Sequence, residues 1–284
     1  MINMESYVRP GTIDEALDLL GKNQGKVLAG GTDLILDLQK KELAGTIVDV
    51  GGIKELQQIK ETEDQVIIGS VVSFTQAEAS PIIQKYCLAL SEAAGLVGSP
   101  QIRNQGTIGG NIANASPAAD TVPAFVAMDA LLRVGSIRGE RIVRITDLLL
   151  GIGKTDLAPD ELILEISFKK LHSFRSSFIK LGRRNALAIS RMSGAAGIRV
   201  DEEGRILEAR IALGSVAPNP FRSTLIESVL VGKNVHDGIP EEAIETAYKD
   251  VEERLGSRAT APYKKEAIKG VVRQALEKIF IEPI

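Results

Sequence analysis

One segment of the chain, residues 93–119, is almost free of charge and constrains the fold more than any other feature. It holds a single charged residue, Arg103, whereas a chain with 25% charged residues would place about seven in a segment of this length. Glycines and small polar residues fill it instead, as in "RNQGTIGGNIANASPAAD" at residues 103–120. A segment of this kind is either buried or wrapped around a ligand.

The chain as a whole has the composition of an ordinary globular protein. Its 284 residues, of which 44% are hydrophobic, suffice for one large domain or a few smaller ones with buried cores. The formal net charge of −3 provides no basic field, so we predict no nucleic-acid partner. Residues 1–20 lack the apolar core of a signal peptide, and no other apolar run has transmembrane length. We therefore expect a cytoplasmic protein without membrane insertion.

Cysteine and histidine are too scarce for most kinds of metal or triad chemistry. Cys87 is the only cysteine, so the chain can form neither an internal disulfide nor a four-cysteine iron–sulfur or zinc site. His172 and His236 are the only histidines and lie far apart in the sequence, which disfavours a histidine metal site or a Ser-His-Asp triad. We predict no metal site and no catalytic side chain, and expect a cofactor to supply the chemistry.

Strand and helix signals alternate in the N-terminal part of the chain, which favours an α/β arrangement. Residues 26–31 and 46–50 have the pattern of short buried strands, and residues 32–42 between them have that of a helix. Ser73 and Gln76 match the capping-box pattern, so a further helix is expected to begin after Ser73.

The pattern changes near residue 173, where we place a domain boundary. Three strand-like runs follow, at 176–182, 189–200 and 205–216, and turn residues join them as in an antiparallel sheet. Apolar stripes at 243–251 and 267–279 predict two amphipathic helices that close the chain.

Two glycine turns are the candidates for ligand binding. "KVLAGGTD" at residues 26–33 and "GTIGGN" at residues 106–111 combine glycines, which leave backbone N–H groups uncovered, with uncharged polar side chains. Neither is a GxGxxG dinucleotide fingerprint. The first turn alone is equally compatible with an ordinary strand-to-helix connection. Together the two turns could hold the pyrophosphate of a dinucleotide.

Other candidate motifs are weaker. "LLLGIGKTD" resembles the end of a phosphate-binding P-loop, but Leu148 stands where the first glycine is required, so we reject it. Arg183 and Arg184 could grip an anion, although adjacent arginines after a strand more often form a solvated turn. Lys180 is ambiguous for the same reason, and Cys87 is expected to be a core thiol.

The two glycine turns and their surroundings carry a family resemblance. "KVLAGGTDLILDLQ" at 26–39, followed by "GSPQIRNQGTIGGNIANASPAADTVPA" at 98–124, resembles the FAD-binding medium subunit of the molybdenum hydroxylases, the xanthine, carbon monoxide and nicotinate dehydrogenase group. The likeness covers nearly the whole chain. It implies a p-cresol methylhydroxylase-type FAD-binding domain of two α/β subdomains, at about 1–55 and 56–173. A C-terminal domain with a three-stranded antiparallel sheet and helices is implied at 174–284, so the fold class implied for the whole chain is α+β.

The resemblance also implies which residues bind FAD. Two loops and three further positions match the family's cofactor contacts: Lys26, Val27, Leu28, Ala29, Gly30, Gly31, Thr32 and Asp33; Gly106, Thr107, Ile108, Gly109, Gly110 and Asn111; Asp120; Leu162 or Ile163; and Ile179 or Lys180. Asp120 has an alternative role as the cap of the helix that follows it. Thr32 stands where some members have a histidine, so the FAD is expected to be bound noncovalently.

The function implied is that of an electron-transfer subunit in an oxidoreductase. In that family a large subunit carries the molybdenum cofactor, a small subunit carries 2Fe-2S clusters, and the FAD subunit passes electrons to NAD or another acceptor. The expected assembly is a dimer of heterotrimers. Two alternatives stay open: a free-standing flavin oxidoreductase of the same fold, and a non-redox nucleotide-binding assembly module.

Overall fold

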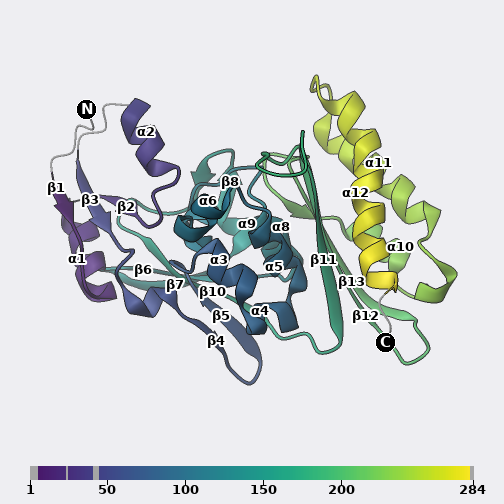
Figure 1. The fold of residues 1–284 in the computed structure, drawn as a ribbon, viewed down its shortest axis with the longest axis horizontal. Coiled ribbons are helices and arrows are strands. Elements are labelled where there is room, and N and C mark those ends of the chain that lie inside the picture. Colours follow the sequence, from purple (N-terminus) through teal and green to yellow (C-terminus); the bar gives the residue numbers. More distant parts are fainter. Residues whose placement is uncertain (1–5, 24, 41–44, 282–284) are drawn as a thin grey trace.

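The computed structural model describes residues 6–23, 25–40 and 45–281 of the chain. Within these residues a small parallel sheet, a five-stranded antiparallel sheet and a four-stranded antiparallel sheet follow one another across the molecule (Figure 1). Helices accompany each sheet. The mixed α+β class predicted from the sequence is therefore confirmed.

The small sheet contains the first glycine turn. Its strands lie in the order β1 (Ser6–Val8), β3 (Thr46–Asp49) and β2 (Lys26–Leu28), with all neighbours parallel. Parallel strands need a crossover, and α1 (Ile13–Asn23) and α2 (Leu34–Lys40) provide the two crossovers. The predicted order of strand, turn, helix and strand is confirmed. Residues 41–42 of the expected helix lie outside the described residues.

The central sheet supports the second glycine turn. Its strands lie in the order β4 (Ile59–Glu61), β5 (Gln65–Gly69), β10 (Leu162–Lys169), β6 (Leu131–Ser136) and β7 (Gly139–Arg144). Six short helices pack above it: α3 (Phe74–Ala79), α4 (Pro81–Tyr86), α5 (Leu88–Gly95), α6 (Pro100–Gln105), α7 (Ile108–Ala113) and α8 (Thr121–Ala127). The capping box is confirmed, because Ser73 and Gln76 each accept a hydrogen bond from the other's backbone N–H, at 3.2 and 2.8 Å. The 3-10 turn η1 (Lys54–Gln57) precedes β4, and α9 (Ile145–Leu148) leads into the hairpin of β8 (Leu149–Gly151) and β9 (Lys154–Thr155).

The C-terminal sheet lies between two hydrophobic cores. Its strands are β11 (Phe174–Leu181), β12 (Met192–Val200), β13 (Ile206–Gly214) and β14 (Phe221–Arg222). One face, with Phe178 and Ala195, joins the core under α5 and α8; the other packs against α10 (Thr224–Leu230), α11 (Glu241–Leu255) and α12 (Ala261–Ile281) (Figure 1). The turn η2 (Val235–Asp237) precedes α11. The sequence predicted three strands here; β14 was missed because two residues give no periodic pattern.

The remaining predictions about single residues fit this packing. Cys87 is buried in the central core, and burial raises the pKa of its thiol to about 12, as expected of an inert core thiol. His172, His236, Arg183 and Arg184 are exposed. None of the described helices is both long and apolar enough to cross a membrane.

Candidate functional site

A cavity of about 590 Å³ lies where the three parts of the fold meet. Its walls come from the turn between β2 and α2, from α7 with the loop that follows it, from the start of β10 and from the end of β11. Most of the residues predicted to bind FAD line it: Val27, Ala29, Gly30, Gly31, Thr32, Asp33, Thr107, Gly109, Gly110, Asn111, Asp120, Leu162, Ile163 and Lys180. This volume is in the range of small-molecule and cofactor sites.

Five predicted residues do not line the cavity, and strand alternation or packing explains each case. Lys26 and Leu28 flank the cavity-lining Val27 on β2, so they point to the other face of the strand. Ile108 is fully buried beneath α7, and Gly106 lies against the Phe74 ring. Ile179 packs against the core beneath α12, which leaves its neighbour Lys180 as the β11 residue at the cavity.

Close backbone packing requires glycine at one position in each of the two turns. A Cβ atom on Gly30 would lie 1.9 Å from the backbone oxygen of Gln105, and one on Gly109 would lie 2.7 Å from that of Ser70. Gly31 has a φ of +72°, which L-residues rarely adopt. Gly30 therefore lets the two turns meet at the cavity, Gly109 lets the second turn approach Ser70, and Gly31 allows the backbone conformation of the first turn.

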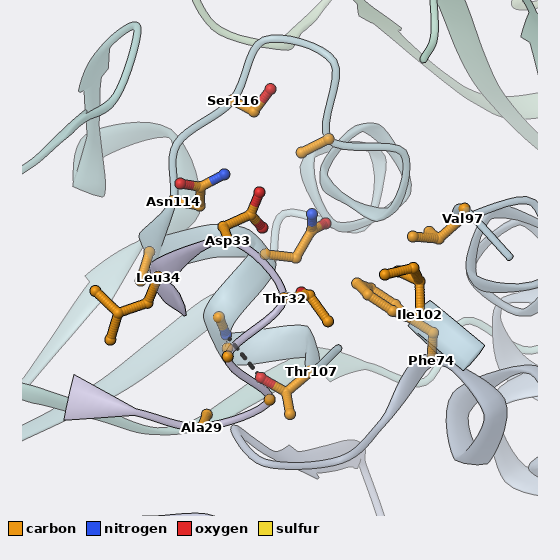
Figure 2. A pocket seen from close by; sticks show the side chains of 18 of the residues that line it. Ala29, Thr32, Asp33, Leu34, Phe74, Val97, Ile102, Thr107, Asn114 and Ser116 are labelled. Atoms are coloured by element: carbon orange, nitrogen blue, oxygen red, sulfur yellow. Dashed lines mark hydrogen bonds between the residues drawn. The ribbon is translucent and has the colours of Figure 1, made fainter. Parts of the chain in front are cut away.

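The backbone N–H groups of the second turn donate hydrogen bonds to other groups of the protein. The amide of Ile108 donates to the backbone oxygen of Val72 at 2.9 Å, and that of Gly109 to Ser70 at 2.8 Å. The amide of Gly110 donates to the Oγ1 of Thr107 at 3.1 Å, in the bond drawn in Figure 2. For the second turn, the expectation of uncovered backbone amides is therefore wrong. The segment before α3 accepts from Ile108 and Gly109, and the N-cap residue of α7 accepts from Gly110.

The first turn has the donors that the second lacks. Among the described residues, none accepts a hydrogen bond from the backbone N–H of Gly30, Gly31, Thr32 or Asp33. These consecutive residues all line the cavity. A row of adjacent N–H groups without protein acceptors is a site for the oxygens of a phosphate group.

Asn111 presents the donor end of its amide to the cavity. The hydroxyl of Thr121, fully buried at the start of α8, donates to Asn111 Oδ1 at 2.7 Å. The oxygen of the amide is thereby held against α8, and its NH₂ group remains for a ligand. No motif marks Thr121, because its role depends on how α7 and α8 pack.

Asp120 and Lys180 form a buried ion pair in the cavity wall. Lys180 Nζ lies 2.5 Å from Asp120 Oδ2, with side-chain exposures of 9% and 7%. Lys180 also donates to the backbone oxygen of Leu96 at 2.9 Å, and Ser190 donates to Asp120 Oδ1 at 2.5 Å. Burial raises the pKa of Asp120, although Lys180 and Ser190 oppose the shift. Asp120 stands at the N-cap position of α8 but its side chain makes no cap bond, so the capping role is wrong.

Several cavity residues have no sequence signal of their own. Figure 2 shows Phe74, Val97 and Ile102 together on one side of the cavity, with Asn114 and Ser116 on the other side, where Asp33 also lies. Asn114 and Ser116 belong to the charge-poor segment, which could have pointed to them. Val97 and Ile102 belong to the same segment, whereas Phe74 comes from α3 and has no such signal. The cavity thus combines an apolar wall with a polar one, as a nucleotide with an aromatic ring requires.

Acidic groups outnumber cations in the lining. The charged residues in the lining are four carboxylates and one lysine: Asp33, Asp37, Asp120, Glu161 and Lys180. Hydrogen bonds from Arg141 lower the pKa of Glu161, so this carboxylate stays ionised. An anionic ligand would therefore be held by backbone donors, while carboxylates suit the hydroxyl groups of a sugar.

Comparison with known proteins assigns the cofactor. Residues 2–168 match the family model described as the FAD binding domain in molybdopterin dehydrogenase. The chain belongs to this family. Residues 177–279 match a second model, the CO dehydrogenase flavoprotein C-terminal domain. The predicted family and cofactor, FAD, are therefore confirmed, and the chain is a subunit of an oxidoreductase.

Full-length relatives carry matching names. The nicotinate dehydrogenase FAD-subunit of Eubacterium barkeri is 34% identical, with 97% of this chain and 95% of the relative covered. The xanthine dehydrogenase FAD-binding subunit of Escherichia coli O157:H7 is also 34% identical, with 98% and 97% covered. The structure of carbon monoxide dehydrogenase from Hydrogenophaga pseudoflava superposes with a TM-score of 0.87 at 29% identity, over 98% of this chain and 97% of that chain.

Proposed function

We propose that this chain is the FAD-binding electron-transfer subunit of a molybdenum-dependent hydroxylase or dehydrogenase. It receives electrons from 2Fe-2S clusters in a small partner subunit, which a large subunit with the molybdenum cofactor supplies, and it passes them to NAD or another acceptor. The observation that carries the proposal is the row of N–H groups at residues 30–33, which have no acceptor among the described residues and belong to residues that line the cavity of a FAD-binding family member.

In this proposal, three groups of residues around the cavity bind different parts of FAD. The N–H groups of Gly30 to Asp33 bind the diphosphate, because they are the adjacent donors without acceptors among the described residues. The NH₂ group of Asn111 binds a hydroxyl or phosphate oxygen, in the direction that Thr121 imposes. Lys180, held by Asp120 and Leu96, orients the ring system from the β11 side. Bound FAD supplies the redox chemistry, and the chain sets its position and exposure.

We also propose that the FAD is bound noncovalently. Thr32 occupies the position where some family members have a histidine. Neither His172 nor His236 lines the cavity, and both are exposed elsewhere. The predicted contacts therefore consist of hydrogen bonds and apolar packing.

The domain division and the assembly complete the proposal. We place the FAD-binding domain at 1–173, with subdomains of about 1–55 and 56–173, and the C-terminal domain at 174–284. The two family models, at 2–168 and 177–279, support a boundary in this region. The Hydrogenophaga relative is named as a medium chain, which supports a complex with large and small subunits and, we propose, a dimer of heterotrimers. A cytoplasmic location stays a prediction.

Co-purification tests the proposal against its alternatives. The full chain is expressed with its neighbouring reading frames, and the complex is isolated through a tag on this chain. Recovery of a yellow complex that contains molybdenum and iron supports an electron-transfer subunit. A yellow chain that stays alone and oxidises a substrate by itself supports a free-standing flavin enzyme, and a colourless chain that binds only AMP supports the non-redox module.

A further inference from the structure

Three cations gather beside the flavin cavity, on the side of the C-terminal domain. Arg191 directly precedes β12, Arg258 lies between α11 and α12, and Lys264 lies in the first turn of α12. Figure 1 shows that α12 begins at the end of the C-terminal sheet where the connection between β11 and β12 lies. None of these three residues contributes to the ion pair at Asp120.

Two contacts and one charge effect place the three cations near one another. Lys264 Nζ donates a hydrogen bond to the backbone oxygen of Ser215. The guanidinium of Arg191 lies 5.6 Å from the centre of the Tyr263 ring, and Tyr263 is the neighbour of Lys264 in the chain. The charge of Arg258 is close enough to lower the pKa of Lys264.

The cluster is attached to the cavity wall through Ser215. The amide and hydroxyl of Ser215 both donate to the backbone oxygen of Pro117, at 3.0 and 3.1 Å. Its hydroxyl also lies 3.2 Å from the backbone oxygen of Ser190, the residue that holds Asp120. Ser116 and Ala118, on either side of Pro117, line the cavity. Lys264 is therefore linked through Ser215 to the segment that forms the cavity wall, although none of the three cations is itself among the lining residues.

The charges of the cluster are not balanced by carboxylates. In the part of the chain that the structure describes, no ion pair includes Arg191, Arg258 or Lys264. The next lysines of the same helix differ, because Lys265 pairs with Glu252 at 2.6 Å and Lys269 with Glu245 at 2.9 Å. Burial, followed by repulsion from the two arginines, lowers the pKa of Lys264. An anion bound between Lys264 and the two arginines would offset the repulsion among their charges.

We propose that Arg191, Arg258 and Lys264 form a phosphate-binding subsite for a nucleotide electron acceptor. Guanidinium groups bind phosphate oxygens in pairs, and the ammonium adds a third charge against a diphosphate. The subsite holds the phosphates of the acceptor at the edge of the cavity, so that its redox-active ring can reach the flavin. This inference rests on the proposed function, since it identifies the acceptor as a phosphate-bearing nucleotide.

Binding to the FAD-loaded full chain tests the subsite at low ionic strength. The probes are ADP-ribose, which has the diphosphate of a dinucleotide without its nicotinamide, AMP, and inorganic pyrophosphate. Calorimetry gives each Kd for the wild-type chain and for Arg258→Ala and Lys264→Met. Each substitution is expected to weaken ADP-ribose binding about tenfold, the usual loss for a charge-assisted hydrogen bond. Lys249→Met, which removes an exposed charge on α11, is the matched control and should bind like the wild type.

The probes distinguish the sources of phosphate. ADP-ribose binding that exceeds pyrophosphate binding and depends on Arg258 and Lys264 supports the subsite. Equal affinity for both probes assigns the cluster to free phosphate and overturns the nucleotide assignment. Absence of binding, or equal binding by both variants and the wild type, overturns the subsite while the FAD content still supports the proposed function. Loss of FAD from the wild-type chain would instead contradict the proposed function.

Discussion

Lys180 and Asp120 form a 2.5 Å ion pair that joins the C-terminal sheet to the wall of the cavity. Both side chains are more than nine-tenths buried, so each charge depends on the other for compensation. Lys180 comes from β11 and Asp120 from the residue before α8. The pair therefore links the cavity wall to the packing of the C-terminal sheet against the start of α8.

Removal of either partner should lower stability, and the two losses should not add. We expect Lys180→Met and Asp120→Asn each to lower the free energy of unfolding by about 3 kcal/mol, because a buried charge loses its partner. The double variant should cost clearly less than the sum of the two. Urea unfolding of the FAD-free chain measures all three variants. Additive costs would show that the two charges do not interact in the folded chain.

The pH dependence of stability should follow from the burial of Asp120. Burial raises the pKa of this carboxyl above its ordinary value of 3.8, so the contribution of Asp120 is most favourable below that value and is lost as the pH rises through the folded pKa. The unfolding free energy of the wild type minus that of Asp120→Asn should therefore fall with rising pH in that window. A difference that rises with pH would mean that attraction by Lys180 outweighs burial.

Thr121 should affect FAD binding only through Asn111. Thr121→Val keeps the side-chain shape but removes the hydroxyl that holds Asn111 Oδ1, so we expect about tenfold weaker FAD binding. Flavin fluorescence titration gives the Kd, and Thr121→Ser should restore it. In an Asn111→Ala background, Thr121→Val should have no further effect. An equal loss in both backgrounds would point to a general packing defect.

Gly30 should not tolerate even a methyl group. Gly30→Ala would place its Cβ 1.9 Å from the backbone oxygen of Gln105, so the two turns must separate. We expect loss of FAD retention on gel filtration, since the N–H groups of the first turn move with it. Gly270→Ala is the control, because its Cβ meets nothing within 4 Å in the middle of α12. Retention of FAD by Gly30→Ala would show that the contact between the turns does not position the site.

The sequence predicts which segments form the cavity, but not which of their backbone groups are available to a ligand. The glycine turns at 26–33 and 106–111 could be found because close backbone approach demands glycine at fixed positions, Gly30 and Gly109 among them. Which N–H groups are available could not be predicted. The acceptors for Ile108 and Gly109 lie before α3, and only the folded chain brings them beside the second turn.

Alternation of side chains along a strand decides which of two candidate residues lines the cavity, but it gives no information about Thr121. The choice between Ile179 and Lys180 follows from alternation along β11 once the buried face is known, since the apolar residue packs under α12. Thr121 shows the opposite case. A threonine at the start of a helix is common, and only the 2.7 Å bond to Asn111 shows its role.

FAD uptake by the purified full chain shows whether this chain binds the cofactor. The chain is incubated with FAD, separated from free cofactor by gel filtration and measured by visible absorption. We predict a yellow protein with about one FAD per chain, because both glycine turns line one and the same cavity. Acid precipitation should release the flavin, because it is held noncovalently. A colourless chain after this treatment would contradict the account.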